Sequence, residues 1–153
     1  MKKLSKDNKG FTLVEMIVVL VILAILAAIL IPGLLGYIDD AKNKQLEIHG
    51  KAVYTAAQAT ASKYYAKNKP IAGDKDFAGL VKSLSELSTF GENAKAVVYF
   101  NSGSGSETYK VSGISYTESE NEDPTVYFKS GKNAEWTTKK PDGFPSGSGI
   151  EIK

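Results

Sequence analysis

The residues with the most specific chemistry lie near the N-terminus, in the stretch "KGFTLVE" of residues 9–15. Glu15 is the one charged side chain within residues 11–31, and all but one of the others are apolar. A carboxylate at the centre of a bilayer costs about 2.5 kcal/mol or more, although less near the interface, so Glu15 calls for a partner. A peptidase cut between Gly10 and Phe11 would create an α-amino cation four residues before this acid. A neighbouring helix shifted along its axis could bring that amine to Glu15, which would neutralise the charge and set the stagger between subunits.

A second interpretation of Glu15 is structural. Thr12 and Glu15 match a capping box, in which the two side chains satisfy free amide donors at a helix start. A carboxylate there also suits the positive end of the helix dipole. Such a cap is worth about 1 kcal/mol. Because a polar cap does not require a charge, capping alone does not account for Glu15.

The element that positions these residues is an apolar helix. As a helix, residues 11–31 extend about 30 Å, which is the thickness of the hydrocarbon core of a bilayer. The basic residues at positions 2, 3, 6 and 9 precede it, which predicts that residues 1–10 stay cytoplasmic and the rest is exported. A cleaved secretory signal is the first alternative, but the apolar run is too long and Leu26-Ala27-Ala28 only imitates its cleavage site. A plain single-pass anchor is the second.

The basic leader, Gly10, the sequence Phe11-Thr12-Leu13-Val14-Glu15 and the apolar run to Pro32 resemble the class III signal of type IV pilins and related pseudopilins. The resemblance implies cleavage by a prepilin peptidase after Gly10, N-methylation of Phe11, and pairing of Glu15 with the N-terminus of a neighbouring subunit. Many pilins have a glycine midway through the apolar run, whereas this chain has Ala24. Pro32 and Gly33 mark the expected helix bend.

The partners implied by this resemblance are further pilin subunits in a homopolymer, the prepilin peptidase and, indirectly, the assembly platform protein and its ATPase. The precursor would lie in the cytoplasmic membrane with its head outside, and the mature form in an extracellular filament that serves adhesion or surface motility. One alternative is a minor pilin, or a pseudopilin of a type II secretion or DNA-uptake system. Another, of a different class, is a membrane-tethered extracellular binding or enzymatic domain.

The remaining chain divides by composition. Residues 1–10 form the leader, residues 11–33 the membrane and filament-core helix, residues 34–67 its amphipathic continuation, and residues 68–153 a globular head. The continuation is Ala-rich and free of proline, and a stripe at helical spacing predicts the face that packs on the head: Leu34, Ile38, Ala41, Ile48, Ala52, Ala56 and Ala59. Asn68-Lys69-Pro70 ends the helix.

The head is predicted to be α+β. A connecting helix covers residues 74–88, with Asp74 as its cap and an apolar face of Phe77, Leu80, Val81, Leu84 and Leu87. The period then changes to two over residues 94–101, 107–117, 125–131 and 134–139, which predicts an antiparallel meander of about four strands within residues 94–139. The candidates for its apolar face are Val97, Tyr99, Val111, Val126, Phe128 and Trp136. The tail after residue 140 could add Ile150 and Ile152 as a last edge strand.

Composition excludes several other functions. All 19 basic residues are lysine, 17 acids nearly balance them, and no nucleic-acid footprint is indicated. Cysteine is absent, so no disulfide or thiolate site is possible. Pilins of Gram-negative bacteria commonly have a C-terminal disulfide, and its absence, with the lysine-only basic set, favours a Gram-positive source.

No enzyme, cofactor or metal site is predicted. His49, the single histidine, is expected to be an exposed or packed helix residue rather than a ligand. The acidic loop at residues 118–123 is expected to be a solvated loop, although its carboxylates could offer oxygen ligands to calcium.

Overall fold

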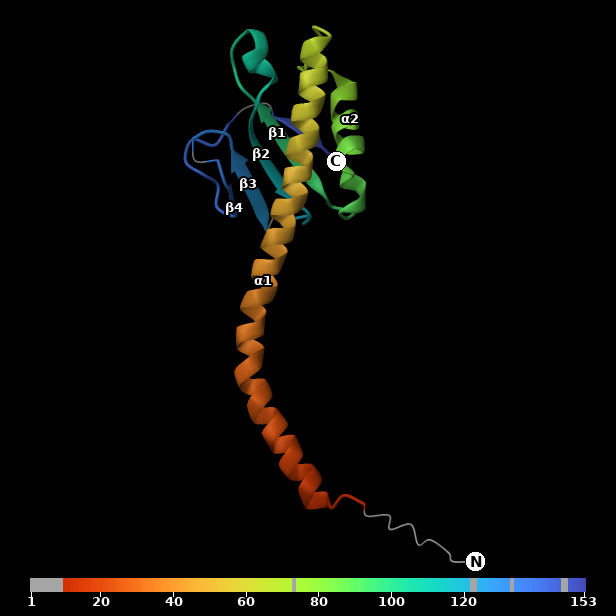
Figure 1. Cartoon of the computed structure of the whole chain (residues 1–153), viewed down its shortest axis with the longest axis vertical. Helices are drawn as coiled ribbons and strands as arrows, with labels where there is room; N and C mark the ends of the chain where they lie inside the picture. The colour runs from red at the N-terminus through yellow and green to blue at the C-terminus, as the bar shows by residue number, and fades with distance from the viewer. Residues whose placement is uncertain (1–9, 73, 122–123, 133, 147–148) are drawn as a thin grey trace, which may run out of the picture. The chain divides into compact units, whose positions relative to one another are not determined.

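The structure is a computed structural model that describes residues 10–72, 74–121, 124–132, 134–146 and 149–153. The chain divides into two compact units, Met1–Asp40 and Ala41–Lys153. Helix α1 spans Leu13–Ala66 and so contributes to both (Figure 1). The long N-terminal helix and the antiparallel sheet that follows it confirm the predicted α+β class.

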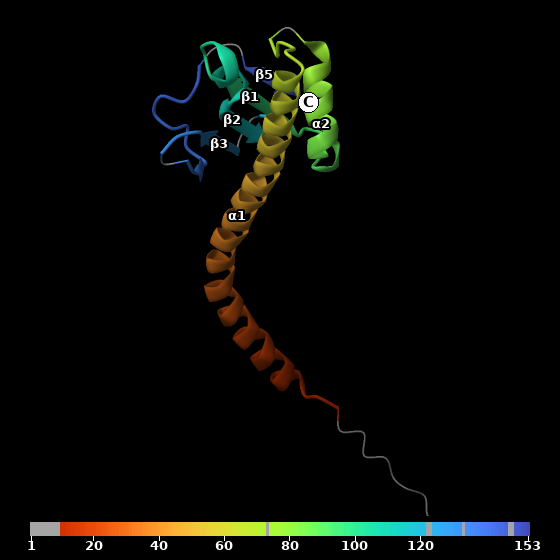
Figure 2. The same ribbon diagram turned by 45° about the horizontal axis from the view of Figure 1, so that its top comes forward.

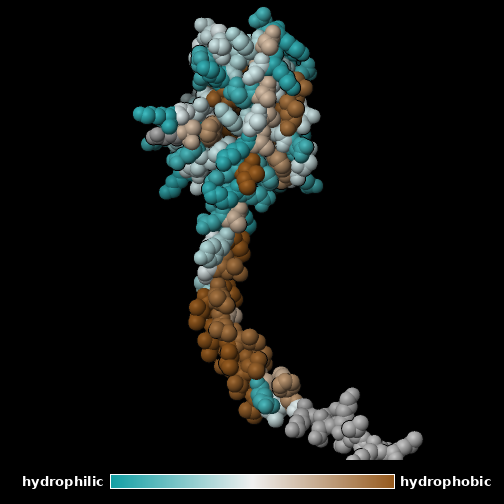
Figure 3. Space-filling model, in the orientation of Figure 1, coloured by the Kyte–Doolittle hydropathy of each residue, from teal (hydrophilic) through white to brown (hydrophobic). Residues whose placement is uncertain are grey.

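In the first unit the described residues are almost entirely helix α1, and its large apolar side chains are all exposed. Figure 3 shows this segment as a nearly continuous apolar surface. Among the described residues, one helix is long and apolar enough to cross a membrane, and it is α1. The helix continues through Pro32 and Gly33 without interruption. The bend predicted at these two residues therefore stays a prediction.

The second unit contains one five-stranded antiparallel sheet in the order β4-β3-β2-β1-β5. Its strands are β1 (Lys95–Phe100), β2 (Val111–Thr117), β3 (Thr125–Lys129), β4 (Trp136–Thr137) and β5 (Ile150–Ile152). The first four form the predicted meander. The predicted extra edge strand is β5, which pairs with β1 through Ala96 and Ile152. Residues 107–109, predicted as part of a strand, instead lie in the 3-10 helix η2 (Gly105–Tyr109), which Gly105 enters with a positive φ of 70°.

Helix α1 packs against the sheet. Helix α2 (Lys75–Ser85) lies beside α1 in both ribbon views (Figure 1 and Figure 2). Asp74 caps α2, because its Oδ1 accepts a hydrogen bond from the Asp76 backbone N–H at 2.8 Å. The 3-10 helix η1 (Leu87–Thr89) follows, and the reversal between them uses Glu86 at a φ of 54°. On α2, Phe77 and Val81 are buried as predicted, but Leu80 and Leu84 are exposed.

The face of α1 that enters the core differs from the predicted stripe. The buried residues of α1 are Leu46, Gly50, Val53, Ala56, Ala57, Thr60, Ala61 and Tyr64. Of the predicted stripe, only Ala56 is among them, and Ile48 is 64% exposed. In the sheet, the prediction that Val97 and Tyr99 face the core is wrong. Ala96 and Val98 are buried under α1 instead, and Tyr99 lies edge-on to Phe144 at a centroid distance of 5.4 Å.

Gly50 lies on the buried face of α1 and explains why that face packs against the sheet. A Cβ atom at Gly50 would lie 2.5 Å from Cζ3 of Trp136, so the absence of a side chain lets the indole ring lie directly on the helix. The ring stacks on Phe128 at 5.2 Å, and Phe128 in turn contacts Tyr54 of α1 at 4.8 Å. Strands β3 and β4 are therefore attached to the helix through one aromatic layer and one glycine.

Substitution of Gly50 by alanine is expected to destabilise the head by about 1–3 kcal/mol, because the added methyl group overpacks the contact with Trp136. Gly79 of α2 is the matched control, since its Cβ would meet nothing within 4 Å. Gly79→Ala should stabilise by about 0.5–1 kcal/mol through helix propensity. Thermal unfolding followed by fluorescence of Trp136, the single tryptophan, measures both. Equal shifts of the same sign would contradict the packing argument.

Candidate functional site

The predicted cleavage site lies just before the described helix begins. Gly10 and Phe11 are exposed and have no regular secondary structure, and the Phe11 side chain is 80% exposed. Helix α1 begins two residues later, at Leu13. A peptidase needs an extended and accessible backbone at the bond that it cuts. The Gly10-Phe11 bond is accessible and lies outside the helix, as a peptidase requires.

Glu15 lies in the first turn of α1 and makes a complete capping box with Thr12. Its Oε2 accepts hydrogen bonds from the Thr12 backbone N–H and from the Thr12 hydroxyl, both at 2.8 Å. The Glu15 backbone N–H donates to Thr12 Oγ1 at 3.2 Å. Thr12 and Glu15 thus satisfy amide donors of the helix start reciprocally.

The capping box engages only one oxygen of the Glu15 carboxylate, Oε2. Every hydrogen bond recorded for the Glu15 side chain within the described residues goes to Oε2. The structural and the assembly interpretations of Glu15 are therefore compatible, because Oε2 can cap the helix while Oε1 accepts a cation. The carboxylate is also stabilised at the helix start by the positive end of the helix dipole.

His49 is a packed helix residue, and the structure identifies contacts that the sequence did not reveal. Its ring stacks on Phe90 at a centroid distance of 4.0 Å and lies edge-on to Tyr116. Its Nδ1 pairs with Oε1 of Glu118, which also accepts a hydrogen bond from the Tyr116 hydroxyl at 2.8 Å. Burial, and then the hydrogen bond to Glu118 and the charge of that group, raise the pKa of Tyr116. This His49 cluster connects α1 to the residues that directly follow η1 and β2, and its contacts are those of a structural core.

The acidic loop contributes one described carboxylate to the His49 cluster. Glu118 faces His49, while residues 122–123, which belonged to the calcium hypothesis, lie outside the described residues. Among the residues that are described, no group of three or more His, Asp or Glu side chains could hold a metal ion.

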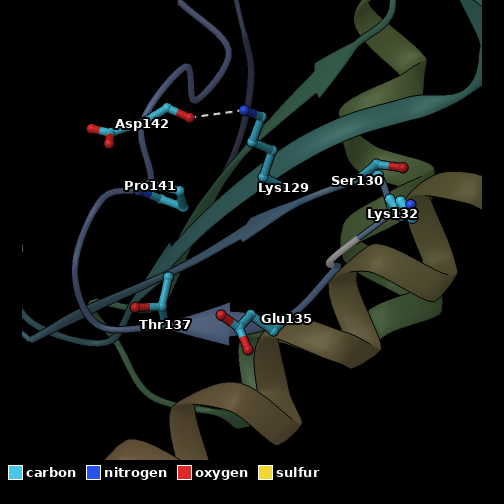
Figure 4. Close-up of a pocket in the computed structure, with 8 residues that line it drawn as sticks. Lys129, Ser130, Lys132, Glu135, Thr137, Pro141 and Asp142 are labelled. Carbon is cyan, nitrogen blue, oxygen red and sulfur yellow. Dashed lines mark hydrogen bonds between the residues drawn. The ribbon is translucent and has the colours of Figure 1, made fainter.

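A surface pocket of about 370 Å³ lies beside β3 and β4 (Figure 4). Lys129 crosses its edge and donates from Nζ to the backbone carbonyl of Asp142 at 2.8 Å. The other liners are Ser130, Gly131, Lys132, Glu135, Thr137 and Pro141. Two lysines and two acids carry its charge, and none of them forms a nucleophile and base pair. We assign the pocket no chemistry.

Comparison with known proteins bears on the N-terminal site. Residues 5–31 match the family described as "Prokaryotic N-terminal methylation motif". Over 57 residues the chain is 37% identical to the type IV major pilin protein PilA of Myxococcus xanthus (strain DK1622). Part of the chain is thus similar to a type IV pilin, and its N-terminal segment carries the methylation motif.

The matches to known proteins are confined to part of the chain. The alignment with PilA covers 37% of this chain, which spans only about a quarter (26%) of the length of that relative. No solved structure matches. The relative comes from Myxococcus xanthus, and the comparison does not support the expected Gram-positive source.

Proposed function

We propose that the protein is the major structural subunit of a type IV pilus. In this proposal a prepilin peptidase cuts after Gly10, Phe11 is N-methylated, and the mature subunits polymerise through residues 11–31. The precursor lies in the cytoplasmic membrane with its N-terminus on the cytoplasmic side and its head outside the cell. The platform protein and ATPase of a pilus machine then add it to a surface filament, which serves adhesion or motility.

The observation that carries the proposal is the carboxylate of Glu15 on an otherwise apolar and exposed helix. Burying a Leu, Ile or Val side chain is worth about 1.5–3 kcal/mol, so a helix that exposes so many of them requires lipid or other helices around it. Glu15 has one oxygen engaged by Thr12, and its other oxygen can accept the α-amino group of a neighbour. Apolar burial supplies cohesion between subunits and the ion pair supplies their register.

The name of the relative, a major pilin, supports assignment as a bulk subunit over a minor pilin or pseudopilin. Glu15 supports it too, because a subunit that initiates a filament has no preceding neighbour whose α-amino group could pair with this carboxylate. The abundance of this chain in purified filaments separates these candidates: a bulk subunit is the main component, whereas a minor pilin is a trace.

Mass spectrometry of the mature N-terminus tests the processing step. The expected result is a chain that begins with methylated Phe11. An intact Met1 would instead indicate a plain anchor, and a cut near Ala28 a secreted domain. Gly10→Val is the control, because a Cβ at Gly10 meets nothing within 4 Å in the chain. Its expected loss of cleavage would therefore report the peptidase rather than misfolding.

A further inference from the structure

The start of helix α1 contains backbone groups that hydrocarbon cannot accommodate. Gly10, Phe11 and Thr12 precede the helix and have no regular secondary structure. A backbone hydrogen bond from the Met16 N–H to the Thr12 carbonyl, at 3.2 Å, opens the helix. The amide groups that precede Met16 lack carbonyl partners in the helix, so side chains or water must satisfy them. Because backbone of this kind is not tolerated against lipid chains, the helix start belongs outside the hydrocarbon.

The Glu15 carboxylate gives the same indication. It is exposed in the first turn, and the two hydrogen bonds that its Oε2 accepts come from Thr12, which is itself exposed. A charged side chain is costly at the centre of a bilayer and much less costly near the interface. Figure 3 shows polar surface at this end of the apolar segment. These groups place the cytoplasmic boundary of the hydrocarbon after Glu15.

The opposite boundary is marked by the next polar side chains along α1. Residues 16–36 carry no polar side chain, and Tyr37 and Asp39 follow them. Tyr37 is 75% exposed, and Asp39 and Asp40 are exposed as well. A tyrosine side chain favours the headgroup layer, where its ring meets apolar surface and its hydroxyl meets water. The aspartates require water, so the outer boundary lies near Tyr37.

The segment between these two boundaries has the length of a membrane span. Residues 16–36 are 21 residues, which extend about 31 Å as a helix and match a hydrocarbon core of about 30 Å. The span predicted from the sequence, residues 11–31, has the same length, so length does not distinguish the two. Their end groups do. The span 11–31 would place Glu15 in hydrocarbon and leave the exposed Leu34 and Leu35 in water, whereas the span 16–36 does the reverse.

We propose that the precursor binds the bilayer with residues 16–36 in the hydrocarbon, the helix start and Glu15 in the headgroup layer on the cytoplasmic side, and Tyr37 in the outer headgroup layer. This inference rests on the proposed function for the membrane and the orientation, and it shifts the expected span by five residues. The Gly10-Phe11 bond then lies outside the hydrocarbon, where a peptidase can reach it. Glu15 stays hydrated in the membrane, and it requires a cationic partner only when other helices surround it during assembly.

Cysteine accessibility locates both boundaries, because the natural chain contains no cysteine. A membrane-impermeant maleimide reacts with a thiol in water and not with one in hydrocarbon. Full-length single-cysteine variants are produced in cells without the assembly ATPase, so that subunits stay in the membrane. Labelling is measured on spheroplasts for the outside and on inside-out vesicles for the cytoplasmic side, relative to labelling in detergent. The six variants are Val14→Cys, Val18→Cys, Leu23→Cys, Leu34→Cys, Leu35→Cys and Asp40→Cys.

Val14→Cys should be labelled from the cytoplasmic side only, at least about five times more than Val18→Cys. Asp40→Cys should be labelled from outside only, at least about five times more than Leu34→Cys or Leu35→Cys. Leu23→Cys is the control at the centre of both spans and should stay unlabelled.

Protection of Val14→Cys, or labelling of Leu34→Cys and Leu35→Cys to the level of Asp40→Cys, would overturn the proposed span and leave the proposed function standing. Labelling of Leu23→Cys as strong as that of Asp40→Cys would show that α1 does not cross the membrane, which would defeat the inference and the proposed function together. Labelling of Val14→Cys from outside would do the same, because it would reverse the orientation on which both depend.

Discussion

Glu15→Ala should leave membrane insertion and cleavage after Gly10 unchanged and yet reduce surface filaments at least about a hundredfold. The variant loses the carboxylate that a neighbouring α-amino group would pair with, and that amine is then left as an uncompensated cation in an apolar setting. Removing one partner of a buried ion pair costs about 3–5 kcal/mol. Since 1.4 kcal/mol changes an equilibrium constant tenfold, the loss at every added subunit exceeds two orders of magnitude.

The measurement is an immunoblot of sheared filaments beside one of whole cells, so that assembly is separated from production. Glu15→Gln is the sharper variant, because it keeps the shape of the side chain and an oxygen that can cap the helix start. We expect it to assemble as poorly as Glu15→Ala. Thr12→Ser preserves the hydroxyl of the capping box and should assemble normally. Normal piliation of Glu15→Gln would show that capping, rather than charge, is what this position contributes.

The largest expected loss of folding stability follows from Phe77→Ala. Phe77 is fully buried on α2, lies edge-on to Tyr64 of α1 at 5.2 Å, and contacts Phe100 of β1 at 5.6 Å. One ring therefore joins three elements. Truncation of a buried phenylalanine to alanine costs about 3–5 kcal/mol, which for a domain of about 100 residues lowers Tm by on the order of 15 °C.

Leu80→Ala is the matched control for Phe77→Ala, because it truncates a large side chain of the same helix that is 46% exposed. Its expected cost is below about 1 kcal/mol. Thermal unfolding followed by circular dichroism compares the two variants with the unmodified chain. If the two Tm shifts were equal, α2 would be held to the head by something other than the aromatic contacts of Phe77.

The sequence predicted the elements of the head better than it predicted their faces. Period-two alternation located the four strands of the meander, but both faces of β1 carry apolar residues, so parity alone could not decide between Val97 with Tyr99 and Ala96 with Val98. The deciding contact is long-range, since Phe144 of the tail covers Tyr99. Along α1, alanines occur on nearly every side, and the buried face was set by Gly50, which accommodates a tryptophan distant in the sequence.

The candidate site divides in the same way. The motif of residues 10–15 could be interpreted because its chemistry is local, and the capping box between Thr12 and Glu15 spans one helical turn. The pair formed by His49 and Glu118 could not be predicted, because its two members are separated by 69 positions. The exposure of Leu84 could likewise not be predicted, since an apolar residue at helical spacing looks the same whether it faces the core or solvent.

Gln58 of α1 links the helix to the sheet through hydrogen bonds of the backbone type. Its Nε2 donates to the carbonyl of Tyr109 and its Oε1 accepts from the Val111 backbone N–H, both at 3.0 Å. The side-chain amide thus occupies the position that a peptide group of an adjacent strand would take at the start of β2. The Val111 proton consequently exchanges with solvent only when the helix and the sheet separate, which makes this one amide an internal gauge of how often the head opens.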